Sequence, residues 1–364
     1  MEITFNRDEA LPALSAVAGA AVKKSTIPIL SNVRIRATDH GAIRFDTTDL
    51  EIAWVAFALG SIPDDCDIAV DARKLMDVVK AAPAGKEIKA KVADGKMVVR
   101  FGGSRFSLSV LDGRDFPDWD STEPACEMDM PSGEFLSMMD ATAFAVAKDD
   151  VRYYLQGMLF SLENQCLNVA ATDGHRLAVS SLEEPGIHCE DLQAIIPGKA
   201  IDQLRKSDQS ENISMRFFHD QVHFCMGEKT LRTKIIEGKF PDYAKVIPKG
   251  HPFALRADVD SLADSLKRVS IVGKDAKGVT LKVGPDSCEI VARNHQNEEA
   301  VEVADVEYSG EPMDIAFSAQ YLVDVLNAIQ TSQVAIELKD SNSAIRVEPF
   351  PSNGDVYVVM PMRL

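Results

Sequence analysis

Apolar residues recur at spacings of three and four near the start of each third of the chain, a pattern that predicts an amphipathic helix. Acidic or helix-capping residues precede each stripe, as expected at a helix N-terminus. The stripes are Leu11, Leu14 and Val17; Phe135, Met138 and Met139; and Leu262, Leu266 and Val269, preceded by Asn6 and Asp8, Ser132 and Glu134, and Asp258 and Asp260.

A second helical pattern also occurs three times. Its apolar pairs are Leu75 and Val78, Ile201 and Leu204, and Leu322 and Val325, and consecutive copies lie about one third of the chain apart. Between the helices, residues 33–37 and 87–92 alternate apolar and polar side chains, which predicts half-buried antiparallel strands. Asp94-Gly95 marks a tight hairpin. Each third is therefore predicted to be an α+β unit of two helices packed on antiparallel sheets.

Short motifs repeat in the same register. Phe116-Pro117-Asp118-Trp119 returns as Phe240-Pro241-Asp242-Tyr243, and Thr48-Asp49 returns as Thr172-Asp173. Ile52-Ala53 then matches Leu177-Ala178 if one inserted residue is allowed. Internal repeats at a fixed period indicate repeated structural units. We predict three similar domains, at residues 1–124, 125–249 and 250–364.

Composition limits the class of protein. The 364 residues carry a net charge of −17, which argues against wrapping nucleic acid by bulk charge but leaves room for a local basic surface. There is no apolar run long enough for a membrane span and no signal peptide at the N-terminus, so we expect a cytoplasmic protein. The six cysteines include no C-x-x-C pair, so we expect reduced thiols and no metal site.

Residues 172–177, Thr-Asp-Gly-His-Arg-Leu, form a polar turn between two apolar runs near the middle of the chain. One interpretation is a hydrolase or transferase in which His175 and Asp173 act on a nucleophile. Residues so close in one loop rarely converge, and the chain lacks a G-x-S-x-G elbow, a phosphate loop and an H-E-x-x-H motif. A second interpretation is an ordinary polar hairpin tip.

The three repeats, the Phe-Pro-Asp-aromatic motifs and residues 171–178 together resemble the bacterial sliding clamp, the β subunit of DNA polymerase III. The resemblance extends to residues 150–157, 236–243 and 357–364, and so covers the whole chain. It implies a non-catalytic processivity factor without cofactor. In that family a head-to-tail homodimer closes a six-domain ring, helices inside and sheets outside, around double-stranded DNA of any sequence.

The resemblance also implies a peptide-binding cleft between the middle and C-terminal domains. Its partners would be the polymerase III catalytic subunit, the clamp loader, and other DNA polymerases and repair proteins that carry a clamp-binding motif. Methionine would let the cleft adapt to varied peptides, and Arg176 could lay its stem on apolar surface with its head in water. The implied cleft residues are Leu155, Thr172, Gly174, His175, Arg176, Leu177, Pro241, Val246, Tyr321, Val359, Met360, Pro361, Met362 and Arg363.

The same resemblance implies DNA contacts at Lys24, Arg73, Lys148, Arg152, Tyr153, Tyr154, Lys199 and Arg205. Contacts of lysine and arginine to phosphate are independent of sequence and therefore compatible with sliding. It implies a dimer interface at Phe106, Leu108, Ile271 and Val272. The chain departs from the family pattern at Lys245, at Ser318 and in a shortened loop at residues 273–278, which bears on peptide preference.

Overall fold

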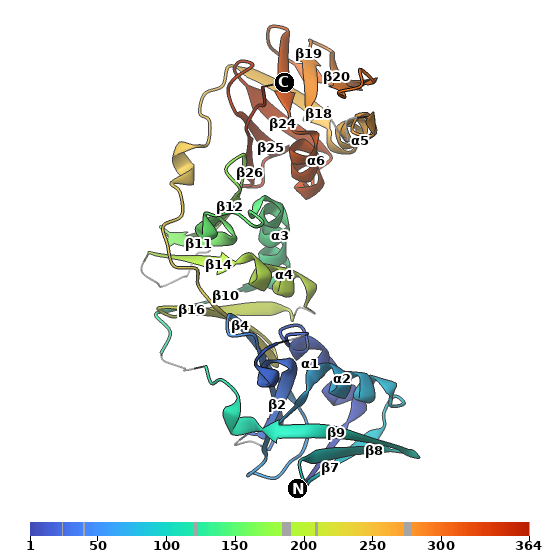
Figure 1. Ribbon diagram of the computed structural model, residues 1–364. Helices are drawn as coiled ribbons and strands as arrows, with labels where there is room; N and C mark the ends of the chain where they lie inside the picture. The colour runs from blue at the N-terminus through green and yellow to red at the C-terminus, as the bar shows by residue number, and fades with distance from the viewer. Residues whose placement is uncertain are drawn as a thin grey trace. The chain divides into compact units, whose positions relative to one another are not determined.

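The computed structural model describes residues 1–23, 25–38, 41–119, 123–183, 191–207, 210–272 and 278–363. Within these ranges the strands group into three sheets in which every pairing is antiparallel. Residue contacts divide the chain, drawn in Figure 1, into two compact units. The first unit holds Met1–Phe135 and Asp202–Ile235, and the second holds Leu136–Ile201 and Ile236–Leu364.

Six α-helices form in the described residues, two in each predicted repeat, as the apolar stripes predicted. Asn6 accepts a hydrogen bond from the amide of Asp8, and Asp258 accepts one from the amide of Ser261, so both cap helices as expected. No helix in the described ranges is long and apolar enough to cross a membrane. The helices are α1 (Arg7–Val17), α2 (Ala72–Ala81), α3 (Ser132–Thr142), α4 (Gly198–Lys206), α5 (Val259–Val269) and α6 (Ala319–Ala328).

The first unit contains a sheet of 13 strands. Helix α1 packs against α2 and against one face of this sheet at β4 (Figure 1). In spatial order the strands are β10 (Cys126–Pro131), β15 (Asn212–Phe217), β16 (Gln221–Met226), β17 (Lys229–Lys234), β4 (Ile52–Ala58), β3 (Ile43–Thr48), β2 (Asn32–Ala37), β6 (Asp67–Asp71), β9 (Ser104–Asp112), β8 (Lys96–Phe101), β7 (Glu87–Ala93), β1 (Glu2–Asn6) and β5 (Gly60–Ser61).

The second unit contains a sheet of nine strands and one of four. Helix α5 packs against α6 and against the smaller sheet. The larger sheet has the order β14 (Leu192–Pro197), β11 (Gly157–Glu163), β12 (Cys166–Thr172), β13 (Arg176–Glu183), β26 (Val356–Val359), β25 (Ile345–Phe350), β24 (Gln333–Leu338), β18 (Phe253–Asp258) and β22 (Glu307–Tyr308), and the smaller has β21 (Glu299–Asp305), β20 (Ser287–Arg293), β19 (Val279–Val283) and β23 (Met313–Phe317).

The two large sheets share one topology. The order β6-β2-β3-β4-β17-β16-β15-β10 in the first unit corresponds strand for strand to β14-β11-β12-β13-β26-β25-β24-β18 in the second. In each case the last strand of one repeat pairs with a strand of the repeat before it, β17 with β4 and β26 with β13. The predicted internal repetition is therefore present in the fold.

Strand pairing corrects one detail of the predicted alignment. Thr48 lies opposite Ala53 across its hairpin, and Thr172 lies opposite Leu177. The turns are thus of equal length, and no inserted residue separates them. Ala53 is the structural equivalent of Leu177, and the proposed match of Ile52-Ala53 to Leu177-Ala178 is wrong by one position.

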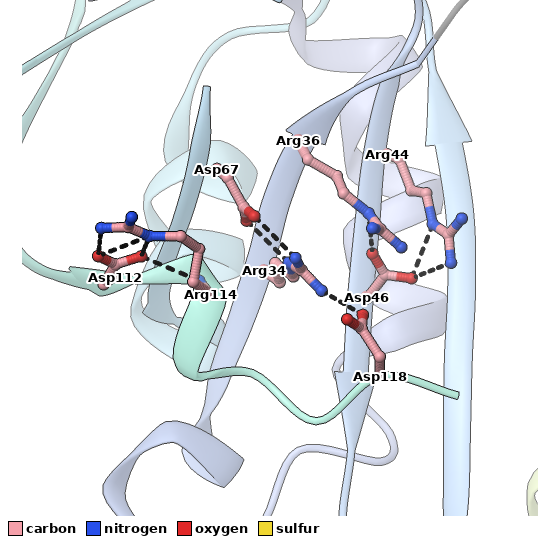
Figure 2. A network of polar contacts seen from close by, with 8 residues as sticks. All are labelled: Arg34, Arg36, Arg44, Asp46, Asp67, Asp112, Arg114 and Asp118. Atoms are coloured by element: carbon pink, nitrogen blue, oxygen red, sulfur yellow. Dashed lines mark hydrogen bonds and ion pairs between the residues drawn. The ribbon is translucent and has the colours of Figure 1, made fainter. Parts of the chain in front are cut away.

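The expected half-buried strands differ from each other. β7 alternates buried and exposed residues from end to end, as predicted. In β2 the prediction is wrong, because Arg34 on the polar face is only 6% exposed. Its guanidinium is held between Asp67 and Asp118, and the segment that carries Asp118 crosses this face (Figure 2). The polar face of β2 was expected to contact solvent, but its Arg34 forms ion pairs inside the protein.

The cysteines agree only in part with the expectation of reduced thiols. Cys66, Cys166, Cys225 and Cys288 are free, and burial raises the pKa of Cys66 to about 11 and that of Cys288 to about 12. Cys126 is disulfide-bonded, so the expectation is wrong at that residue.

Candidate functional site

The turn between β12 and β13 is built by two side chains that bond to its backbone. The Thr172 hydroxyl donates to the carbonyl of Arg176 at 2.6 Å and accepts from the amide of Gly174 at 3.0 Å. Asp173 Oδ1 accepts from the amides of His175 and Arg176 at 2.9 and 3.0 Å. Gly174 has a φ of +88°, in the left-handed region that glycine adopts without strain.

Arg152 lies directly against this turn. A Cβ atom on Gly174 would lie 3.0 Å from both terminal nitrogens of the Arg152 guanidinium. The guanidinium donates to the carbonyl of Asp173 at 3.1 Å and pairs with Asp150 at 2.8 Å. The Arg152 hydrogen bond lowers the pKa of Asp150 to about 2, so this pair stays ionised at neutral pH. Glycine is therefore favoured at position 174 for two independent reasons, its left-handed backbone and the close approach of Arg152.

Beside the turn the second unit has a cleft of about 220 Å³. Its floor is a buried apolar cluster that includes Leu155, Leu177 and Val358. Met360 is 42% exposed at the rim, and its amide donates to the carbonyl of His175. The lining residues are Arg152, Leu155, Thr172, Gly174, His175, Arg176, Leu177, Pro241, Tyr243, Val246, Val358 and Met360.

Arg176 has a more fixed position than the sequence suggested. Its guanidinium pairs with Asp173 at 3.0 Å and Asp324 at 2.5 Å, and donates to the carbonyl of Phe144 at 2.8 Å. It also lies 4.5 Å from the ring centroid of Tyr321. The side chain is only 11% exposed, so the expectation of a solvated head is wrong. Arg176 connects β13 to α6 and holds one wall of the cleft in place.

Nine of the predicted cleft residues line the cleft together: Leu155, Thr172, Gly174, His175, Arg176, Leu177, Pro241, Val246 and Met360. Tyr321 stands one layer behind, with its ring stacked on His175 at a centroid distance of 6.2 Å. The structure does not place Val359, Pro361, Met362 or Arg363 in the lining. The amide of Met362 instead donates to the carbonyl of Ala316 in β23.

Three lining residues were missed as cleft residues. Val358 takes the place expected for Val359 because side chains alternate along β26, and Val359 is completely buried on the other face. The period-two pattern could have identified this choice. Tyr243 directly continues the repeated motif that contains Pro241. Arg152 was predicted only as a DNA contact, and no sequence signal indicates its proximity to Gly174.

Three protein-family models match the chain, each for one domain of the DNA polymerase III beta subunit. The N-terminal domain matches residues 1–120, the central domain 129–242 and the C-terminal domain 244–363. The beta sliding clamp of Escherichia coli K12 is 38% identical over the full length of both chains. The chain belongs to the beta sliding clamp family.

Solved sliding clamps have the same fold over the full length of both chains. The Pseudomonas aeruginosa DNA polymerase III subunit beta is 35% identical with a TM-score of 0.94, and a second structure of that clamp is bound to griselimycin. The Caulobacter crescentus clamp is 32% identical, also with a TM-score of 0.94. The predicted fold class, three repeated α+β clamp domains, is confirmed.

A sliding clamp is a non-catalytic processivity factor of DNA polymerase, and the geometry of the turn is consistent with that role. Asp173 uses both carboxylate oxygens within the turn, on two backbone amides and on Arg176. The His175 ring stacks on Tyr321, and no hydrogen bond joins it to Thr172 or Asp173. The nucleophile, base and orienting acid of a hydrolase are therefore not assembled here.

The predicted DNA-contacting residues of the clamp lie on helices and short turns. Arg73 on α2, Lys199 and Arg205 on α4, and Lys148 are exposed. Tyr153 is exposed, whereas Tyr154 packs against the apolar cluster of the cleft. Arg152 lines the cleft itself. Lys24 lies outside the described residues.

The predicted dimer residues lie beside open sheet edges. Residues 104–109 of β9 pair with β8 alone, and Phe106 and Leu108 are half-buried there. In the other unit β21 pairs with β20 and with no other strand of the described ranges, and its Val301 and Val303 are exposed. Ile271, at the end of α5, is 70% exposed, and Val272 is half-buried. The sequence prediction missed β21, although its alternating valines indicate an edge strand with two apolar positions.

Two of the residues that depart from the family pattern lie in the described ranges. Lys245 forms an exposed ion pair with Asp242 at 2.7 Å. Ser318 precedes α6 without a side-chain capping bond. Residues 273–277 of the shortened loop lie outside the described residues.

Proposed function

We propose that the cleft beside residues 172–177 binds the short clamp-binding peptides of the polymerase III catalytic subunit, the clamp loader, and other DNA polymerases and repair proteins. The observation that carries this proposal is an apolar cleft of about 220 Å³ in which the Thr172 hydroxyl and the Arg176 guanidinium are already hydrogen-bonded to the protein. A peptide can bury leucine and phenylalanine side chains there without leaving protein donors or acceptors unpaired.

The adaptable part of the cleft is its rim. Met360 and Val246 both line the cleft with exposed, apolar side chains. Leu177 and Val358 form a fixed apolar floor, while Met360 can change rotamer to fit different partners. The ligand-bound Pseudomonas aeruginosa clamp supports the view that this family offers a binding site for ligands. Tyr321, Val359, Pro361, Met362 and Arg363 remain proposed as supporting residues of the wall.

We further propose a head-to-tail homodimer that forms a ring of six domains. The open edge of β9 beside Phe106 and Leu108 would pair with the open edge of β21 in the second copy, with Ile271 and Val272 at the same interface. Pairing would satisfy backbone groups at both edges and cover exposed valines. The three domains per chain are assigned to residues 1–124, 125–249 and 250–364.

The ring would enclose double-stranded DNA, which it would contact through Lys24, Arg73, Lys148, Arg152, Tyr153, Tyr154, Lys199 and Arg205. Because phosphate contacts carry no sequence information, the ring could slide. Affinity for open linear DNA should be weak and fall steeply as salt is raised. A protein that acts on the bacterial chromosome would work in the cytoplasm. Binding that does not change with salt would contradict the phosphate contacts.

Two matched variants test the cleft and the interface. Met360→Asp places a charge at the exposed rim and should weaken binding of a Gln-Leu-x-Leu-Phe peptide by at least tenfold, measured by calorimetric titration, without changing the oligomeric state. Ile271→Asp should shift the dimer toward monomer in light scattering and leave peptide affinity unchanged. Each variant is the control for the other. Peptide affinity unaffected by Met360→Asp would contradict the cleft, and a stable monomer in the unmodified protein would contradict the ring.

A further inference from the structure

The first unit has a second cavity at the position equivalent to the peptide cleft. It lies on the β2-β3-β4-β17 face, beneath the segment that carries Phe116 and Trp119. Strand register assigns the equivalent residues: Arg34 corresponds to Leu159, Asp46 to Ala170, Ala53 to Leu177, and Arg232 to Val358. Basic residues and one carboxylate thus replace the apolar floor of the peptide cleft.

The charges on this face do not balance. Arg34 is neutralised by a bidentate pair with Asp67, at 2.7 Å for both bonds, and by Asp118 at 2.6 Å. The remaining carboxylate, Asp46, bonds Arg36 through one oxygen at 3.2 Å and Arg44 through the other at 2.8 Å (Figure 2). Both carboxylate oxygens of Asp46 are therefore already bonded to arginines other than Arg232.

Arg232 lines the same cavity and has no ion pair with any described residue. Its Nε atom is buried and has no hydrogen-bond partner. Burial and the like charges of Arg44 and Arg36 lower the pKa of this guanidinium, while Asp46 opposes the shift. The neighbouring His223 adds no positive charge, because burial, Arg232 and Arg216 lower its pKa to about 3. On this face four guanidiniums, those of Arg34, Arg36, Arg44 and Arg232, therefore meet three carboxylates, which leaves an excess of one positive charge.

A buried, unpaired donor beside an excess of positive charge is costly unless an acceptor is present. We propose that the cavity binds one small inorganic anion, which Arg232 holds together with Arg36 and Arg44. The cavity volume of about 30 Å³ admits one or two water-sized groups, so it suits a halide or the leading oxygens of a single oxyanion and is small for a peptide side chain or a nucleotide. Guanidinium groups bind oxyanions through paired N–H donors, which favours phosphate over chloride.

Such an anion would connect strands from two successive repeats. Arg232 belongs to β17 of the second repeat, whereas Arg36 and Arg44 belong to β2 and β3 of the first. A shared anion would bridge them across β4, which lies between β3 and β17. Binding should therefore stabilise this junction without contributing to the peptide cleft.

Thermal unfolding of the full chain at constant ionic strength tests the proposal. Replacing fluoride salt by phosphate should raise the unfolding midpoint by about 2–4 °C in a saturable manner when the anion reaches ten times its dissociation constant. Arg232→Leu should remove the saturable part. Arg100→Leu, which deletes an exposed arginine on β8 of the same unit, should retain it. An equal response in all three proteins would identify a general salt effect and overturn the proposal.

A second measurement requires no variant and decides the case even if Arg232→Leu does not fold. Crystals soaked in bromide should show an anomalous peak in contact with Arg232, Arg36 and Arg44, and the peak should disappear when phosphate competes. A peak retained in phosphate would assign the site to halides and overturn the preference for oxyanions. No peak at this position, with only water there in both soaks, would overturn the site itself.

Discussion

The cleft of the second unit, which we propose to bind peptides, and the cavity of the first unit are two versions of one structure. The turn at residues 48–53 repeats the hydrogen bonds of the turn at 172–177: Thr48 donates to the carbonyl of Ile52, and Asp49 accepts from the amides of Glu51 and Ile52. Leu50, with a φ of +79°, stands where Gly174 has +88°. The backbone is thus reproduced even where the residue type opposes it.

The side chains decide what each position can do. In the second unit Leu159, Leu177 and Val358 leave an open apolar cleft of about 220 Å³. In the first unit Arg34 and Arg232 replace two of these residues, and the space shrinks to about 30 Å³. The apolar floor of the cleft can bury apolar ligands. The ion pairs of the cavity instead hold together neighbouring segments of the protein. Repetition supplied two sites, and substitution at a few inward-facing positions gave them different chemistry.

The largest expected loss of stability comes from replacing Arg34, the residue that most distinguishes the cavity from the cleft. Arg34→Leu, which introduces the residue of the apolar cleft, leaves Asp67 and Asp118 without their partner and should destabilise the protein by about 3–4 kcal/mol in urea unfolding. Adding Asp67→Asn and Asp118→Asn should recover at least half of the loss. A cost below 1 kcal/mol for the single variant would mean that these ion pairs do not hold the junction.

The converse exchange acts on the apolar floor. Leu177→Ala introduces the residue found at position 53 and removes buried side-chain volume, so it should cost about 2–3 kcal/mol of stability. Affinity for a clamp-binding peptide, measured by calorimetry below the unfolding temperature, should fall with it. The matched exchange Ala53→Leu should destabilise by overpacking but leave peptide affinity unchanged. Loss of peptide affinity in Ala53→Leu would break the distinction between the sites.

Lowering the pH should destabilise the first unit, because His223 is held neutral in the folded protein. Its pKa of about 3 in the folded chain lies below the ordinary value of about 6.5, so the unfolded chain takes up the proton first as pH falls. The associated stability is present above pH 6.5 and is lost on acidification, by about 2 kcal/mol between pH 7 and pH 5. Unfolding free energies of the unmodified protein and of His223→Gln at the two pH values measure this difference. Identical pH profiles would show that His223 is not held neutral.

The smallest effect concerns the turns. Leu50→Gly should stabilise the protein by about 0.5–1 kcal/mol, because glycine relieves the left-handed strain of leucine at a small entropic cost. Gly174→Ala should do the opposite, since its Cβ would crowd the Arg152 guanidinium. Denaturant midpoints of the two variants provide the measurement. Stabilisation by Gly174→Ala would contradict the close contact with Arg152.

The helices, the repeats and the location of the cleft could be predicted because they depend on periodicity and on local motifs. The stripe of Leu262, Leu266 and Val269 forms α5, and residues 172–177 form the predicted wall. What the sequence did not reveal depends on contacts between distant residues. Arg34 in an alternating strand indicates a solvated face until Asp118, from the end of the repeat, is brought over it. Arg152 was predicted only as a phosphate contact, because its proximity to Gly174 also depends on the folded structure.

The central repeat is divided between the two compact units, because β10, β15, β16 and β17 complete a sheet begun by the first repeat. The sequence repeat is therefore not the same segment of chain as the compact structural unit. Excising residues 125–249 would leave β17 without β4 and β13 without β26, two long edges open to aggregation. A chain of three sequence repeats thus folds into two units whose borders differ from those of the repeats, and strand pairing joins each repeat to the next.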